Sequence, residues 1–364
     1  MHDPIPSAAS RSDGLVDVHA HFLPPWYVDL ARRHGHDVPD GMPAWPAWDA
    51  RAHLAFMDER RIARSLLSLS SPGIALGPDI DHPALARRVN EHGAEEAARR
   101  PDRFGLLASL PLPDVDAALA ELDHALDTLG ADGVVLSTHA DGVYLTESRH
   151  EPLWAALAAR ECVVLIHPTA PVGSQATRLG LPLPMMEFLF DTTRVVLGLA
   201  LAGVLTRHRG LRLVVPHAGS LVPLLADRVA LFQLGTRMTL PPEDPEHAVP
   251  GVVEALDNLW WDLAGTPTAT HVNALLTRYG SARLLYGSDF CFTPPIAVDL
   301  QMALLDQVWP ALPSPDGPGT PDGPGIPEPW RDLTRANADR LLRRSSTAPA
   351  PELPGRADGD RSQG

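Results

Sequence analysis

The chain has 364 residues, of which 45% are hydrophobic and 21% are charged, as in an ordinary globular protein. Its 45 acidic residues outnumber 30 basic ones and give a formal net charge of -15, which argues against nucleic acid or an anionic membrane as a partner. Every basic residue is arginine. Chemistry that requires lysine is therefore excluded: Schiff bases, pyridoxal-phosphate catalysis, a P-loop and a carboxylated lysine between two metal ions.

Residues 1–14 are mostly polar, contain no apolar signal segment and are predicted to be flexible. The longest apolar run, Val195–Leu205, has 11 residues and is too short to span a bilayer. Cys162 lies in an apolar run, which favours a buried free thiol over a disulfide. These features predict a cytoplasmic enzyme with no membrane partner.

Short apolar runs recur along the chain, and helix-like segments such as Asp114–Leu129 and Pro152–Arg160 separate them. The runs are rich in Val, Leu and Ile without strict alternation, which is typical of strands buried on both faces of a parallel sheet. They are Leu15–His19, Ile62–Leu69, Phe104–Leu110, Gly133–Thr138, Cys162–His167, Leu211–His217, Leu259–Leu263 and Arg283–Gly287. Eight strands alternating with helices predict a closed (β/α)8 TIM-type barrel rather than a doubly wound sheet.

Two segments interrupt this alternation. The stretch Pro24–Asp49 is rich in Trp and Pro and is predicted to be a loop or insertion after the first strand, over the barrel mouth. The stretch Pro310–Pro329 is dominated by Pro and Gly and predicts an irregular loop, followed by a helix at Trp330–Arg344. Residues 15–344 are therefore expected to form a single barrel domain, and residues 345–364 a disordered tail.

The first strand ends in His19-Ala20-His21. Side chains at i and i+2 share one face of a strand, so the two imidazoles can meet at the carboxyl end, where barrel enzymes place their sites. With 16 histidines in the chain, such a pair can also arise by chance and simply close a strand. The pair alone leaves both interpretations open.

Three more strand ends carry similar groups. The fifth run ends at His167, the sixth at His217, and Asp289 follows the eighth. If the strands close into one barrel, these side chains converge with His19 and His21 at its mouth. Three imidazoles and one carboxylate suit Zn²⁺, with Mn²⁺ as another possible ion, and leave a coordination position open.

The residues at these strand ends resemble the amidohydrolase superfamily, and within it the branch of aminocarboxymuconate-semialdehyde decarboxylase and related non-oxidative aromatic-acid decarboxylases. The matching motifs are Asp17–Pro24, Ile166–Pro168, Val215–Ser220 and Tyr286–Phe290. The segments Ala44–Pro72 and Phe188–Thr193 are most similar to 6-methylsalicylate decarboxylases. The resemblance covers most of the chain and implies the same barrel fold.

The resemblance implies roles for individual residues. It implies metal ligation by His19, His21, His167 and Asp289, with His217 as a catalytic acid/base and Asp289 as an alternative proton donor. It also implies a homodimer. Where the aminocarboxymuconate enzyme has an arginine that binds the substrate carboxylate across the dimer interface, this chain has Arg228. A surface ion pair with a neighbouring carboxylate explains Arg228 equally well.

The missing lysine bears on the number of metal ions. Two-metal members of the superfamily commonly bridge their ions with a carboxylated lysine after the fourth strand, where this chain continues to His139. A single metal ion is therefore expected. His139, Ser71 and Trp48 are further candidates for substrate binding, although a solvated loop histidine, a turn serine and a packing tryptophan are equally compatible with their positions.

Two enzymatic outcomes fit this set of residues. The first is non-oxidative decarboxylation of a small aromatic acid, resembling 6-methylsalicylate or another hydroxybenzoate, or of a dienoic acid, with no organic cofactor. The second is hydrolysis of an ester, lactone or amide by a metal-activated water. A barrel that binds a metal or ligand without turnover is a third interpretation. We predict the decarboxylase, acting on a small-molecule carboxylic acid.

Overall fold

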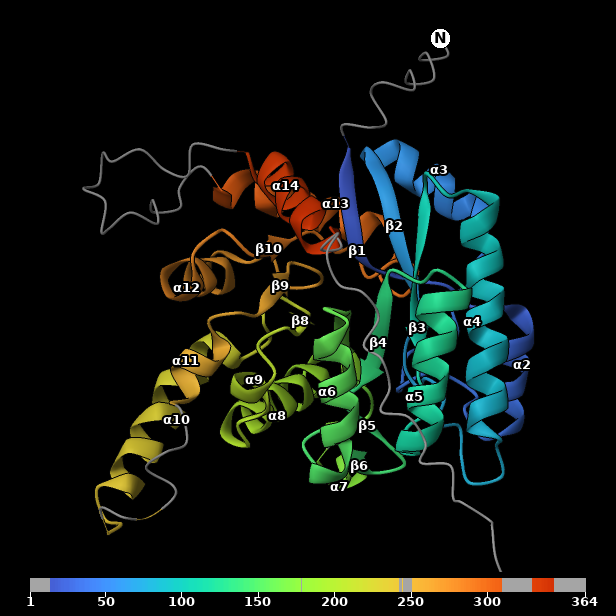
Figure 1. Ribbon diagram of the computed structural model, residues 1–364. Coiled ribbons are helices and arrows are strands. Elements are labelled where there is room, and N and C mark those ends of the chain that lie inside the picture. The colour runs from blue at the N-terminus through green and yellow to red at the C-terminus, as the bar shows by residue number, and fades with distance from the viewer. Residues whose placement is uncertain (1–13, 178, 242–243, 245–250, 310–328, 344–364) are drawn as a thin grey trace, which may run out of the picture.

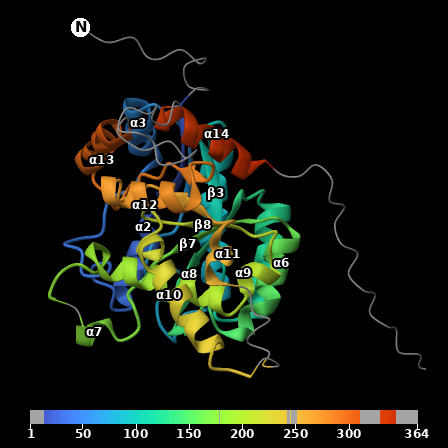
Figure 2. The same ribbon diagram turned by 90° about the vertical axis from the view of Figure 1, so that its left-hand side faces the viewer.

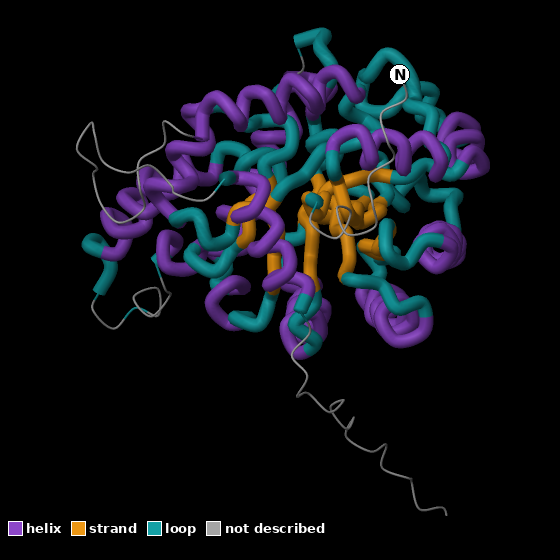
Figure 3. The backbone as a smooth tube through the Cα atoms, turned by 90° about the horizontal axis from the view of Figure 1, so that it is seen from above, coloured by secondary structure: helices purple, strands orange, loops and turns teal. Residues whose placement is uncertain are grey.

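The computed structural model describes residues 14–177, 179–241, 244, 251–309 and 329–343. Eight parallel strands form one sheet in the order β1-β2-β3-β4-β7-β8-β9-β10, and helices surround them (Figures 1 and 3). The predicted (β/α)8 barrel is confirmed, with every predicted run contributing a strand. The strands are β1 Leu15–His21, β2 Ile62–Ser68, β3 Phe104–Ser109, β4 Gly133–Ser137, β7 Val163–His167, β8 Arg212–Val215, β9 Trp260–Asp262 and β10 Leu284–Leu285. The predictions for residues 1–13, 310–328 and 344–364 lie outside the described residues.

Helices follow most strands. They are α2 Pro25–Arg33, α3 Ala50–Arg60, α4 His82–Arg99, α5 Val115–Asp123, α6 Glu151–Ala159, α7 Ser174–Thr177, α8 Glu187–Leu201, α9 Val204–Arg207, α10 Val222–Arg237, α11 Val252–Leu256, α12 Ala269–Tyr279, α13 Pro295–Val308 and α14 Trp330–Leu342. A two-stranded hairpin of β5 (His139–Ala140) and β6 (Val143–Tyr144) follows β4. No helix within the described residues is long and apolar enough to cross a membrane.

The insertion after β1 is partly helical, which corrects the expectation of a loop. Pro24 is the N-cap of α2, and the nine residues that follow it form this helix, which begins with a proline at its first position, where the missing N–H is tolerated. Asp49 then caps α3 by accepting a 2.9 Å hydrogen bond from the Ala52 N–H. Between these helices, residues 34–49 remain without regular secondary structure.

The barrel interior is filled by a cluster that includes Val16, Val18, Leu107 and Leu165, and α14 packs its Leu341 against this cluster. These small aliphatic layers make the barrel a packed core rather than a pore. In Figure 1, α14 lies near the amino-terminal end of β1. The predicted helix after the Pro/Gly-rich stretch thus covers the end of the barrel opposite the predicted site.

A register shift in β1 determines which side chains reach the mouth. Val16 and Val18 belong to the interior cluster, so strict alternation would direct His19 and His21 outward. The pairing of β1 with β2 is irregular between Asp17 and Ala20. A bulge of this kind reverses the alternation, and it lets the two histidines join the interior face beyond the valines.

Asp17 closes the barrel between β1 and β10. Its carboxylate accepts hydrogen bonds from the Ser288 N–H (3.0 Å) and hydroxyl (2.6 Å) and from the His19 N–H (3.2 Å). The backbone adds a bond from the Val18 N–H to the Tyr286 carbonyl. Asp17 therefore has a structural role, since it joins β1 to the segment that follows β10.

Replacing Asp17 with alanine is therefore expected to destabilise the fold, because it strands three buried donors. We expect a loss of about 2–4 kcal/mol in the free energy of unfolding, measured by denaturant titration. Asp29, exposed on α2, is the control, and its alanine variant is expected to stay within about 0.5 kcal/mol of the wild type. Equal stability of the two variants would contradict this role.

Candidate metal centre

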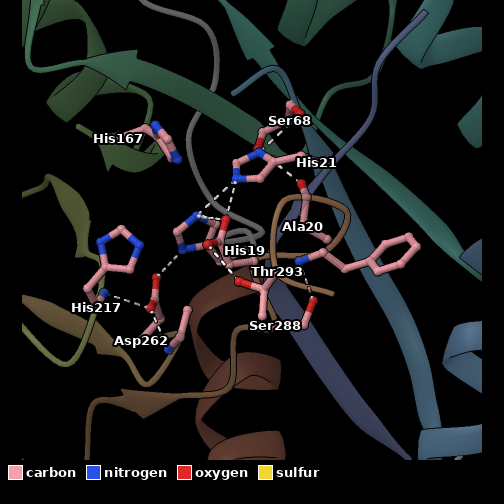
Figure 4. A network of polar contacts seen from close by, with 12 residues as sticks. His19, Ala20, His21, Ser68, His167, His217, Asp262, Ser288 and Thr293 are labelled. Carbon is pink, nitrogen blue, oxygen red and sulfur yellow. Dashed lines mark hydrogen bonds and ion pairs between the residues drawn. The ribbon is translucent and has the colours of Figure 1, made fainter. Parts of the chain in front are cut away.

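Four candidate ligands meet at the mouth of the barrel. One side-chain ligand atom from each of His19, His21, His167 and Asp289 lies within 4.8 Å of the others. His19 and His21 come from β1, His167 ends β7 and Asp289 follows β10. The predicted convergence of strand ends is therefore observed, and Figure 4 shows the three imidazoles turned toward a common point.

The outer ring nitrogens of the three histidines are held by acceptors. His19 Nδ1 lies 3.0 Å from Asp262 Oδ2, and His167 Nδ1 lies 2.7 Å from the Pro168 carbonyl. His21 Nδ1 lies 3.0 Å from the Ser68 hydroxyl, which itself donates to the Ala20 carbonyl. Because these contacts require Nδ1 to donate, each inner Nε2 presents a lone pair when its imidazole is neutral, which is the form that binds a metal ion.

These inward lone pairs define what the centre can bind. The Nε2 atoms of His19 and His21 are 3.2 Å apart, and His21 Nε2 is 3.1 Å from Asp289 Oδ1. The Nε2 of His167 is buried and has no hydrogen-bond partner among the residues that the structure describes. Acceptors that face one another at such distances repel unless a cation lies between them, so the donor set fits a divalent metal ion.

The charges around His19 favour a cation as well. Burial alone would lower the pKa of His19, but the carboxylates of Asp262 and Asp289 outweigh this and raise it to about 9. For Asp289, burial opposes ionisation, yet His21 and His19 hold its pKa below the usual value. The site is thus an electronegative point inside the barrel.

Asp289 divides its two carboxylate oxygens between two tasks. Its Oδ1 faces the Nε2 atoms of His21 (3.1 Å) and His19 (3.7 Å). Its Oδ2 accepts a 3.0 Å hydrogen bond from the hydroxyl of Thr293, a residue that also lines the adjoining cavity. Thr293 therefore determines which oxygen faces the candidate metal position.

His217 stands beside the four candidate ligands. Its ring centre is 5.3 Å from that of His19, its Nδ1 is buried without a hydrogen-bond partner, and Asp262 Oδ1 accepts its backbone N–H at 3.1 Å. Burial lowers the pKa of His217 to about 4, so its imidazole is neutral near pH 7. This geometry is compatible with the predicted acid/base role.

The backbone is strained at two of these positions. His217 and Asp289 both have a φ of 57°, in the left-handed region that non-glycine residues rarely adopt. Such conformations cost about 1–3 kcal/mol and cluster at functional sites. The strained backbone thus lowers the stability of the fold, and it directs the side chains of His217 and Asp289 to the barrel mouth.

A cavity of about 540 Å³ adjoins the centre and includes His167, His217 and Asp289 in its lining. Its wall is mainly apolar, formed by Met42, Pro182, Pro184, Met185, Phe188, Leu189, Phe292, Pro294 and Ala297. Further polar groups come from Asp40, Ser70, Thr266, Thr293 and Gln301. Neither arginine nor any other cationic side chain is among these described lining residues, apart from the histidines.

The four residues predicted to bind substrate lie outside this cavity lining. Trp48 packs against Phe22 and donates to His53 Nδ1, and Ser71 shares a 2.8 Å hydrogen bond with Thr169. His139 lines a neighbouring cavity of about 440 Å³. Arg228 is exposed on α10, with its guanidinium 5.0 Å from the Phe232 ring. In this chain the side chains of Trp48 and Ser71 thus make contacts with neighbouring protein residues.

Three residues of the site escaped the sequence analysis. Asp262 is the last residue of β9, and its place at a strand end was a usable signal, because the other site residues occupy such positions. Thr293 lies four residues beyond Asp289, and the turn between them brings the two side chains into contact. No sequence motif indicated this contact. Asp40 lies in the irregular part of the insertion, where the sequence has no periodicity to place it.

A family model described as Amidohydrolase matches residues 16–344. The chain belongs to this amidohydrolase family. It is 34% identical to a 6-methylsalicylic acid decarboxylase of Penicillium expansum over 78% of this chain and 86% of that protein. It is 33% identical to the decarboxylase yanB of Aspergillus niger, over 80% of this chain and 81% of the relative. These relatives place the chain in the decarboxylase branch of the amidohydrolases, as the sequence motifs predicted.

A solved structure supports the fold assignment. The dihydroxybenzoic acid decarboxylase of Polaromonas sp. JS666, which contains manganese and the inhibitor 2-nitroresorcinol, superposes with a TM-score of 0.72. The two chains are 21% identical, and the match covers 91% of this chain and 97% of the other. At this identity the likeness establishes the shared barrel.

Proposed function

We propose that this amidohydrolase removes the carboxyl group of a small hydroxybenzoate, with 6-methylsalicylate-like acids favoured, by using one divalent metal ion. The observation that carries the proposal is the junction of His19, His21, His167 and Asp289 with a mainly apolar cavity. The Penicillium relative acts on an acid of this kind, according to its name. A bound metal ion would supply positive charge that holds and polarises the oxygens of the substrate acid.

The cavity wall suits a substituted aromatic ring. Phe188, Phe292 and Met185 provide apolar contact area for a ring and a methyl group. Since no arginine is among the described lining residues, the acidic end of the substrate is best placed at the metal side. The ring then lies against the apolar wall, and its carboxyl-bearing carbon comes close to His217 and Asp289.

These two side chains can move the proton that the reaction consumes. His217 or Asp289 Oδ2 first takes up a proton from solvent and then delivers it to the ring carbon that carries the carboxylate, and aromaticity is lost. The bond to the carboxyl carbon then breaks, its electron pair returns to the ring, and CO2 leaves. One proton is consumed for each CO2 released, and no oxidant or organic cofactor is needed.

Incubation with substituted salicylates, with CO2 release and phenol formation followed together, tests the activity. We expect equal amounts of CO2 and phenol from 6-methylsalicylate. Turnover of esters or lactones without CO2 would instead support the hydrolase interpretation. Metal analysis of the purified protein is expected to give about one ion per chain. We propose Zn²⁺ because three imidazoles and a carboxylate suit it, with Mn²⁺, which the Polaromonas protein holds, as the alternative.

Thr293 is expected to act as a positioning residue for Asp289. Replacing Thr293 with valine removes the hydrogen bond to Oδ2 and keeps the side-chain shape, so we expect about a 10- to 100-fold loss in kcat or metal affinity. The serine variant retains the hydroxyl and is expected to recover most of the activity. Steady-state kinetics and metal titration of both variants check this, and equal behaviour of Val and Ser would contradict it.

We also propose a cytoplasmic homodimer that covers the outer face of α10. In Figures 1 and 2 this helix lies at the periphery of the molecule. Leu231 and Phe232 on the helix are 69% and 65% exposed, and Met238 directly after it is 79% exposed. Exposed apolar area of this kind marks an association surface, and Arg228 lies within it. Light scattering of the wild type and of Phe232→Glu tests the proposal, since a monomeric wild type would refute it.

A further inference from the structure

Asp40 lies where two covering loops meet. Its carbonyl accepts a 2.9 Å hydrogen bond from the Leu183 N–H, and a Cβ at Gly41 would lie 3.6 Å from the Cα of Pro182. The segment between α2 and α3 is thus joined to the segment between β7 and α8 beside the cavity. Asp40 lines both the 540 Å³ cavity and the neighbouring 440 Å³ cavity.

Asp40 is chemically unlike the rest of the cavity wall. The ionisable residues of that lining are Asp40, His167, His217 and Asp289, and the last three belong to the metal centre at the strand ends. Asp40 is supplied instead by the covering loop, among prolines and methionines. Its carboxyl group interacts with the Ser71 hydroxyl and the Ala170 N–H, which come from two further loops and fix its position.

We propose that Asp40 is the specificity-determining residue of the cavity: it hydrogen-bonds a second ring hydroxyl, so that the preferred substrate is a methylated dihydroxybenzoate. This inference rests on the proposed decarboxylase function and names its substrate class more closely. A carboxyl group offers about four acceptor positions, and the two described partners leave capacity for a ring substituent.

The chemistry of Asp40 selects among possible substituents. A second carboxylate on the ring would be repelled by it, and a methyl group would leave its carboxyl group desolvated without a new partner. A phenolic hydroxyl pairs with either form of the acid, since it donates to a carboxylate and accepts from a protonated carboxyl. Burial raises the pKa of Asp40 to about 6, so both forms are accessible near neutral pH.

A matched pair of substrates tests the inference, because 2,4-dihydroxy-6-methylbenzoate and 6-methylsalicylate differ by one hydroxyl. We expect the wild type to prefer the dihydroxy acid by about 10- to 100-fold in kcat/KM. Asp40→Leu is expected to lose this preference, with a much larger fall in kcat/KM for the dihydroxy acid than for 6-methylsalicylate, and Asp40→Asn is expected to retain part of the preference. Asp37→Asn, on an exposed residue of the same loop, serves as the matched control. An equal loss on both acids, or no preference in the wild type, would overturn the inference.

The product phenols separate this inference from the proposed function. Calorimetry with 5-methylbenzene-1,3-diol and 3-methylphenol measures the same contact without turnover. Tighter binding of the diol by the wild type and by Asp37→Asn, lost in Asp40→Leu, supports the role of Asp40 even if neither acid releases CO2. Equal binding of the two phenols by the wild type overturns it even if both acids are decarboxylated.

Discussion

Replacement of His217 with asparagine is expected to reduce kcat by about 10²- to 10⁴-fold and to leave the metal content of the protein unchanged. His217 is not one of the four clustered candidate ligands, and its Nδ1 has no hydrogen-bond partner within the part of the chain that the structure describes. Its loss should therefore remove proton transfer or substrate orientation without opening the metal site. Metal analysis and steady-state kinetics on the same preparation check both halves.

The pH profile adds a readout that a purely structural role would not change. Burial lowers the pKa of His217 to about 4, so the free enzyme is expected to keep a neutral imidazole from neutral pH down to about pH 4. As the pH falls toward that value, the imidazole gains the proton that it is proposed to deliver, so the fraction of the donor form rises. The corresponding change in kcat/KM should be present in the wild type and absent from His217→Asn. His34→Asn, at the end of α2, is the control. Undiminished activity of His217→Asn would refute the catalytic role.

The barrel could be predicted from the sequence because its signal repeats. Each strand is a short aliphatic run between turn residues, and the strands are parallel. The carboxyl ends of all eight therefore lie at the mouth of the barrel. The convergence of His19, His167 and Asp289 follows from that topology alone. The bulge within β1 could not be predicted in this way, because the motif around His19 and His21 reads as plain alternation. The i and i+2 argument correctly placed His19 and His21 on one face of β1. The irregular pairing between Asp17 and Ala20 is what turns that face toward the barrel interior.

The cavity was harder to predict because loops form most of its wall. Trp48 was a candidate for substrate binding, and in the structure it packs against Phe22 and His53. Such tertiary contacts cannot be predicted from the local sequence pattern. Asp40 reaches the cavity through the contact of its loop with Leu183, more than a hundred residues away in sequence. Arg228 lies exposed on α10, outside the cavity lining. Strand ends are fixed by topology, whereas loop residues are fixed by contacts between distant segments.

His167 offers the sharpest test of the metal centre. Replacing His19 would strand the buried Asp262, with which it pairs at 3.0 Å, and replacing His21 would break its contacts with Ser68. Among the described residues, the Nε2 of His167 has no hydrogen-bond partner, and its Nδ1 contacts the adjacent Pro168 carbonyl. Loss of this side chain therefore separates metal binding from the hydrogen bonds that hold the fold together.

We expect His167→Ala to lose most of its metal and at least about 10³ in kcat/KM, because a metal ion contributes several kcal/mol to transition-state stabilisation. A ligand at a hundred times its Kd stabilises a folded protein by about 2.7 kcal/mol, so added metal should raise the Tm of the metal-free wild type and leave that of His167→Ala nearly unchanged. Without metal the two proteins should unfold at similar temperatures. His139→Ala, in the neighbouring cavity, should behave as the wild type. A His167→Ala variant that keeps one ion per chain and full activity would contradict the proposed metal centre. It would show that His167 is not needed to hold the ion.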